Sequence, residues 1–133
     1  MTAPAEASQP RVVSVRSLVE FVLTAGDITP GGFQRRDRAQ LGTQGHRRVQ
    51  RSRPAGYQTE VAVSYRVEGA HPPLEIQGRI DGVYPGTDPL IIEEIKTTTL
   101  SLDLIGEEHN RLHWAQAQCY ACMIARREQL GRV

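Results

Sequence analysis

Two carboxylates and one lysine, Asp81, Glu94 and Lys96, lie close together near the middle of the chain. Carboxylates held near apolar neighbours repel one another and lose hydration, so they normally need a cation or extensive hydrogen bonding. A divalent cation such as Mg²⁺ meets that need and keeps several waters, which leaves positions for a phosphate and an attacking water. Lys96 would orient that water as a compact positive charge. The three residues therefore predict metal-dependent hydrolysis of a phosphate ester.

These residues can meet only if the surrounding segment forms a hairpin. Residues 74–84 alternate apolar and polar side chains, which is the pattern of a half-buried strand. Residues 85–89 supply the Pro, Gly and Asp that are typical of turns. Residues 90–98 alternate again and place the glutamate and the lysine on one face. Antiparallel pairing would bring all three charged residues to one end of one face.

The composition of the chain favours a specific role for Lys96. A glutamate and a lysine on one strand face usually form an ordinary ion pair that reveals nothing about function. Here, however, the chain contains 15 Arg and one Lys, which is Lys96. A sequence so biased toward Arg indicates that this position requires a compact ammonium rather than a planar guanidinium.

A second charged feature is the arginine-rich segment at residues 34–53. It holds seven Arg against one acid, Asp37, for a local net charge of +6. Charge runs usually form solvated helix faces, but such faces mix signs, and this one barely does. A phosphate backbone is the natural complement. We expect six of these arginines to contact DNA: Arg35, Arg36, Arg38, Arg47, Arg48 and Arg51.

The same predicted helix contains Gly42, Gly45 and His46. Each glycine costs about 1 kcal/mol relative to Ala inside a helix, which indicates a close approach to the sheet or to DNA. A lone histidine is more often structural than a ligand, and the spacing alone favours the structural interpretation.

The last predicted helix, residues 108–130, carries polar residues on an otherwise apolar face. They are His113, Gln116 and Tyr120. Such a stripe either forms hydrogen bonds within the core or supplies donors to the site or to a DNA phosphate. The spacing leaves both interpretations open.

Four segments in this order resemble the PD-(D/E)XK nuclease superfamily, particularly its RecB-like branch. The nuclease-like domains placed before DinG/XPD-type helicase modules are the most similar. The segments are RAQLGTQGHRRVQ, GRIDG, IIEEIKT and HWAQAQCYA. The resemblance spans residues 12–125, which is nearly the whole chain.

This resemblance implies a DNA nuclease that acts with a helicase in DNA repair or processing. It implies that Mg²⁺ or Mn²⁺ is held by His46, Asp81, Glu94 and the backbone carbonyl of Ile95. It also makes functional roles for Gln116 and Tyr120 the favoured interpretation, and leaves His113 open. The alternative is a catalytically inactive module of the same fold, which binds DNA or serves as a structural part of a helicase complex.

Other metal sites and activities are excluded. His109, His113, Cys119 and Cys122 have zinc-ligand spacings, but they lie along one continuous predicted helix and span too much length to surround one ion. An iron–sulfur cluster needs four Cys, and the chain has two. The sequence also has no Walker-type phosphate loop, so we expect no ATPase.

Length and composition limit the class of protein. A chain of 133 residues allows one domain with a modest core, and its net charge of +1 excludes a globally basic protein. No apolar run reaches the length of a membrane span, and residues 1–10 lack the apolar core of a signal peptide. We therefore expect a soluble cytoplasmic protein with no membrane contact. Residues 1–10 would form a disordered tail and residues 11–133 the single domain.

The expected fold is α/β, in the order α-α-β-β-β-α, with a mixed or antiparallel sheet packed against helices. The first helix would begin at Ser14 and end at Gly26. The first strand would span residues 57–67, where Glu60 can face the metal side, although a single Glu at a strand start is usually just exposed. RecB-like domains continue into another strand after the last helix, so we expect a truncated or divided unit.

Overall fold

The computed structural model describes residues 8–23, 36–106 and 110–133, and for residues 36–40 it describes the backbone alone. The fold is α/β and contains a mixed sheet of four strands. The elements in chain order are β1 (Arg11–Ser14), α1 (Val15–Leu23), α2 (Arg36–Arg51), β2 (Gln58–Val67), β3 (Leu74–Tyr84), β4 (Ile91–Glu93), the 3₁₀ helix η1 (Leu102–Leu104) and α3 (Arg111–Glu128).

Strand β3 is the centre of the sheet. β2 pairs with it antiparallel along almost its whole length, from Gln58↔Val83 to Val67↔Leu74. The other edge of β3 is shared, because β1 pairs in parallel with its first residues and β4 pairs antiparallel with its last. Among the described residues, β3 therefore pairs with each of the other strands, and it is the element that carries Asp81.

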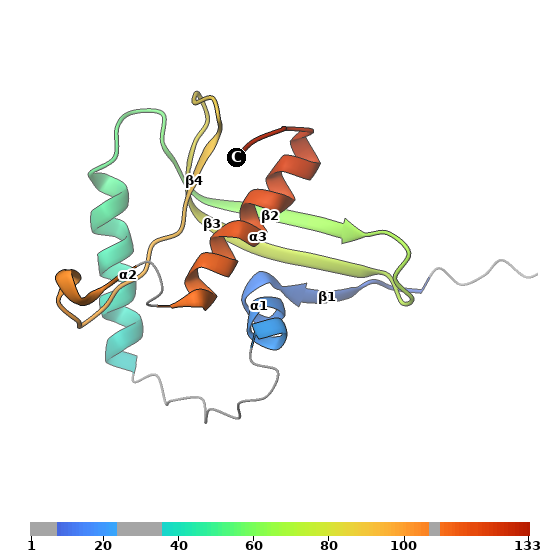
Figure 1. The fold of residues 1–133 in the computed structure, drawn as a ribbon, viewed down its shortest axis with the longest axis horizontal. Helices are drawn as coiled ribbons and strands as arrows, with labels where there is room; N and C mark the ends of the chain where they lie inside the picture. The colour runs from blue at the N-terminus through green and yellow to red at the C-terminus, as the bar shows by residue number, and fades with distance from the viewer. Residues whose placement is uncertain (1–7, 24–35, 107–109) are drawn as a thin grey trace, which may run out of the picture.

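Helices α1 and α3 pack together on one face of the sheet, and α2 lies at the β4 end (Figure 1). The core is formed by aliphatic, Met and Tyr side chains from α1, β2, β3 and α3. Its buried members are Val15, Val19, Val63, Ile80, Val83, Tyr120, Met123 and Ile124. No described helix is both long and apolar enough to cross a membrane.

The structure confirms the α/β class, the mixed sheet and the central hairpin, and it corrects two predictions. The expected order omitted β1, whose four residues are too few to show an alternating pattern and which is defined by its pairing with β3. The strand expected over 90–98 is wrong, because β4 ends at Glu93. Two residues later, the Ile95 N–H donates to Asp81 Oδ2 at 2.7 Å, so a side chain takes the place of a backbone partner.

Some expectations fall on residues that the structure does not describe. Residues 1–7 of the expected tail and the helix stop at Gly26 are among them. The expected helix at 108–130 is observed as α3, which begins after the cap residue Asn110, whose side chain accepts from the Leu112 N–H at 3.0 Å.

Candidate metal centre

Asp81 is the buried carboxylate at the centre of the candidate site. It is 8% exposed and lies on β3. Its Oδ1 is 3.4 Å from Nδ1 of His46, and its Oδ2 accepts from the Ile95 N–H. The structure thus brings α2, β3 and the segment after β4 together at this carboxylate.

A third potential ligand, Glu60, joins this pair. One ligand atom each from His46, Glu60 and Asp81 lies within 4.8 Å of the others. Glu60 is exposed on β2, between Thr59 and Val61, which pair with the two neighbours of Asp81, Gly82 and Ile80. The sequence pattern alone does not assign Glu60 to the site, because a single Glu at a strand start is usually just exposed. Aligning the two strands in antiparallel register would have been the signal, since facing residues share one side of a sheet.

Glu94 and Lys96 contact each other, and the Glu94 carboxyl is influenced by the charges of Asp81 and His46, but Glu94 is not part of the group whose ligand atoms lie within 4.8 Å of one another. Lys96 Nζ is 2.7 Å from Glu94 Oε1, whereas Glu94 Oε2 is buried and has no hydrogen-bond partner among the described residues. Burial raises the pKa of the Glu94 carboxyl, Lys96 opposes that rise, and the Asp81 charge adds to it. The buried oxygen is therefore an acceptor that a cation would satisfy. The Ile95 carbonyl remains a predicted ligand.

The two glycines of α2 explain how that helix reaches the site. A Cβ at Gly45 would lie 2.5 Å from Thr97 Cγ2, and a Cβ at Gly42 would lie 3.5 Å from Thr97 Oγ1. The predicted close approach is thus made to the segment that carries Lys96. It places His46, the residue after Gly45, against the sheet.

The polar stripe of α3 faces the sheet in part. Tyr120 packs over Gly78, where any Cβ would lie 2.5 Å from its ring, and its hydroxyl accepts from the Arg79 N–H at 3.3 Å. Burial raises the pKa of the Tyr120 hydroxyl. Gln116 is 8% exposed on the same helix. These contacts tie α3 to β3, and catalytic roles for both residues stay predictions.

The arginine-rich segment divides into two parts. Arg47, Arg48 and Arg51 line a shallow hollow of about 360 Å³ on α2, together with Gln44. Arg53 instead bonds to Glu93, through Nε at 3.1 Å and through a second guanidinium nitrogen. Arg35 lies outside the described residues, as do the side chains of Arg36 and Arg38. The hollow thus gathers three of the six arginines that the sequence predicts to contact DNA.

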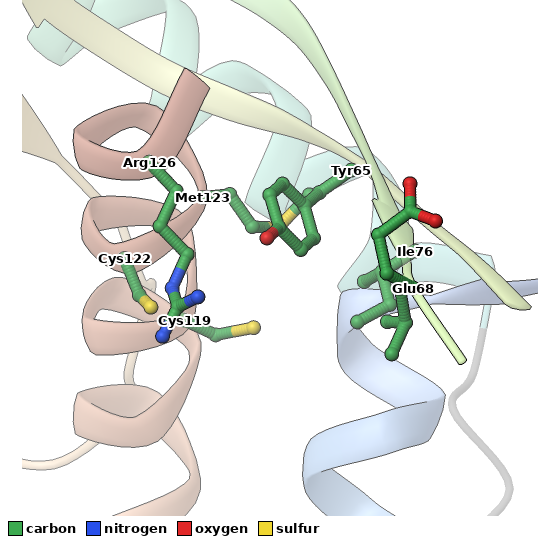
Figure 2. Close-up of a pocket in the computed structure, with 8 residues that line it drawn as sticks. Tyr65, Glu68, Ile76, Cys119, Cys122, Met123 and Arg126 are labelled. Atoms are coloured by element: carbon green, nitrogen blue, oxygen red, sulfur yellow. The ribbon is translucent and has the colours of Figure 1, made fainter. Parts of the chain in front are cut away.

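A second hollow, of about 420 Å³, lies between α3 and the end of the β2–β3 pair (Figure 2). Cys119 and Cys122 line it, and both are free thiols. Burial raises the pKa of the Cys119 thiol, which disfavours the thiolate that a metal would need.

No family model, curated protein or solved structure matches this chain. The PD-(D/E)XK resemblance therefore stays a prediction that rests on the four sequence segments and is carried into the proposal below.

Proposed function

We propose that the chain is a divalent-metal-dependent DNA nuclease of the RecB-like PD-(D/E)XK type. One observation supports this above all. The buried Asp81 contacts His46 and also accepts from the backbone between Glu94 and Lys96. Residues from three separate motifs thus meet at one carboxylate, as a single catalytic centre requires.

The donor set fits a small divalent cation. His46, Asp81 and Glu94 would hold Mg²⁺ or Mn²⁺, and the buried unpaired Glu94 Oε2 is the donor that most needs such a partner. When bound, the cation would neutralise charge on the scissile phosphate and polarise it.

The remaining chemistry belongs to the protein's own side chains. One of the three Lys96 donors is committed to Glu94, and the others can orient an attacking water and offset charge on a phosphoryl oxygen. The arginines of α2 would bind the DNA backbone without reading base sequence. A helicase partner, a role in DNA repair or processing and a cytoplasmic location complete the proposal, and they rest on the sequence alone.

Cleavage assays with purified protein test this function. Single-stranded and double-stranded DNA are each incubated with Mg²⁺, Mn²⁺ or a chelator. We expect metal-dependent cleavage that falls by about 10²–10³-fold in Lys96→Ala, with DNA affinity nearly unchanged. Lys96→Arg should also fail, because a planar fork does not replace a compact ammonium. Arg66→Ala, an exposed change on β2, is the control for loss of one positive charge and should cleave normally.

Two results would count against a nuclease. Wild-type protein that binds both DNAs but cleaves neither with any metal would favour the inactive DNA-binding module. Equal cleavage by wild type and Lys96→Ala would remove Lys96 from the chemistry.

A further inference from the structure

Glu60 has an unusual backbone for a residue inside a strand. Its φ is +53°, in the left-handed region that side chains other than Gly, Asn and Asp seldom occupy. The register runs Thr59↔Gly82 and then Val61↔Ile80, and it omits the pair that Glu60 would make with Asp81. The pairing between β2 and β3 is thus interrupted at the position of Glu60 and Asp81, although β2 itself continues.

Gln50, a residue of α2, bonds to both strands at this position. Gln50 Nε2 donates to the Asp81 carbonyl at 2.9 Å and to Glu60 Oε1 at 3.0 Å. One amide therefore joins the backbone of β3 to the carboxylate of Glu60. It holds that carboxylate near Asp81 although two like charges repel.

The spacing of the three side chains suits one small cation. Ligand atoms about 2.1 Å from an octahedral ion lie about 3.0 Å apart in adjacent positions and about 4.2 Å apart in opposite ones. The ligand atoms of His46, Glu60 and Asp81 lie within 4.8 Å of one another. A small movement of these side chains toward each other would therefore bring the three atoms to the spacing of ligands around one ion. They come from three elements, α2, β2 and β3, and Glu60 is exposed, so water can reach the open positions.

We propose that Glu60 is a direct ligand of the cation, together with His46 and Asp81. Glu60 belongs to none of the four family-like segments, and the proposal rests on the proposed metal site only for the roles of His46 and Asp81. Charge supports it. Glu60, Asp81 and Glu94 contribute three negative charges, which Lys96 and one divalent cation neutralise.

Mn²⁺ titration calorimetry on the full chain without DNA tests this ligand. Glu60→Gln removes the charge but keeps the size of the side chain and the oxygen that accepts from Gln50. Glu60→Gly removes the whole side chain and adopts the left-handed backbone conformation without strain. Glu68→Gln, an exposed change just past β2, is the matched control. We expect the Kd for Mn²⁺ to rise about tenfold or more in both Glu60 variants and to stay unchanged in the control.

The outcomes separate this proposal from the proposed nuclease function. Mn²⁺ affinity equal to wild type in a folded Glu60→Gln or Glu60→Gly variant overturns the ligand, even if the wild type cleaves DNA. Absence of Mn²⁺ binding by the wild type overturns it as well. Glu60-dependent Mn²⁺ binding without DNA cleavage upholds the ligand and contradicts the nuclease. Circular dichroism melting curves establish which variants are folded. If Glu60→Gln is not folded, the Mn²⁺ affinity of Glu60→Gly decides the question.

Discussion

Glu93 and Glu94 are neighbours in the sequence, yet their carboxylates have different surroundings. Both oxygens of Glu93 are occupied: Arg53 donates to Oε1, and the Tyr84 hydroxyl donates to Oε2 at 3.2 Å. Glu94 is paired through Oε1 with Lys96, and its buried Oε2 has no partner among the described residues. Both oxygens of one carboxylate have partners, and the other carboxylate keeps one buried oxygen without a partner among the described residues.

At the end of β4, the Glu93 side chain therefore belongs to the packing of the protein, and the Glu94 side chain belongs to the candidate metal centre. Consecutive residues of an extended chain point to opposite sides, so a single strand end serves both purposes. On the Glu93 side, Tyr57 and Tyr84 stack edge to face with ring centroids 4.9 Å apart, and the Tyr57 hydroxyl fills the space over Gly82. That side is a packed cluster that holds the hairpin. The Glu94 side is the candidate metal centre.

The largest expected effect is the loss of cleavage in Glu94→Gln. Removing the charge should lower metal-dependent cleavage by about 10²-fold or more, since a charged donor to the cation becomes a neutral amide. The melting temperature should be no lower than that of wild type, because a carboxylate that is costly to bury has been removed. Cleavage and melting are measured on the same preparation. A large fall in melting temperature would show that Glu94 is structural.

Glu93→Ala should have the converse effect. It removes the acceptor of Arg53 and Tyr84, so we expect the free energy of unfolding to fall by about 1–3 kcal/mol. Cleavage by the folded protein should change by a few-fold at most. Urea unfolding measures the change in the free energy of unfolding, provided that the dependence of this free energy on urea concentration is the same in both proteins. A loss of cleavage as large as that of Glu94→Gln would erase the distinction between the two residues.

The double change Arg47→Ala with Arg48→Ala tests the α2 hollow. We expect weaker binding of all DNA sequences alike, by roughly tenfold at low salt, and a shallower salt dependence, because fewer counterions are released. Arg126→Ala with Arg127→Ala removes the same charge from the end of α3 and is the control. An unchanged salt slope in the α2 variant would remove this helix from the DNA interface.

The smallest expected effect concerns Gly45→Ala. Its new Cβ would meet Thr97 Cγ2, so the segment carrying Lys96 should shift and cleavage should fall a few-fold. Adding Thr97→Ser removes that methyl and should restore activity. Gly42→Ala meets ordinary contact distances and should leave cleavage unchanged while stabilising the helix by about 1 kcal/mol. Equal effects of the two glycine variants would contradict the close approach.

Much of the fold could be predicted from the sequence, because β2 and β3 alternate clearly and α1 has strong apolar spacing. β1 is too short to carry a pattern. The end of β4 depends on the Asp81 side chain, which captures the Ile95 N–H from the neighbouring strand. Neither feature is encoded within its own segment.

The candidate site could be proposed from the sequence where the residue types themselves suggest chemistry. Asp81, Glu94 and Lys96 follow from charge and spacing, whereas His46 required the family resemblance. Glu60 was considered for the metal side but not assigned to the site, because its position near Asp81 depends on strand register and on a left-handed backbone inside a strand. Arg53 belongs to the same charged run as Arg47, but tertiary contacts make it a partner of Glu93.

Metal binding by Asp81 tests the central claim most directly. Asp81→Asn keeps an oxygen that can accept from the Ile95 N–H and removes the charge, so the fold should persist. Asp88→Asn, in the exposed turn before β4, is the matched control. Titration calorimetry with Mn²⁺ should show binding by wild type and by Asp88→Asn, and none by Asp81→Asn. Equal Mn²⁺ binding by all three proteins would contradict a metal centre at Asp81.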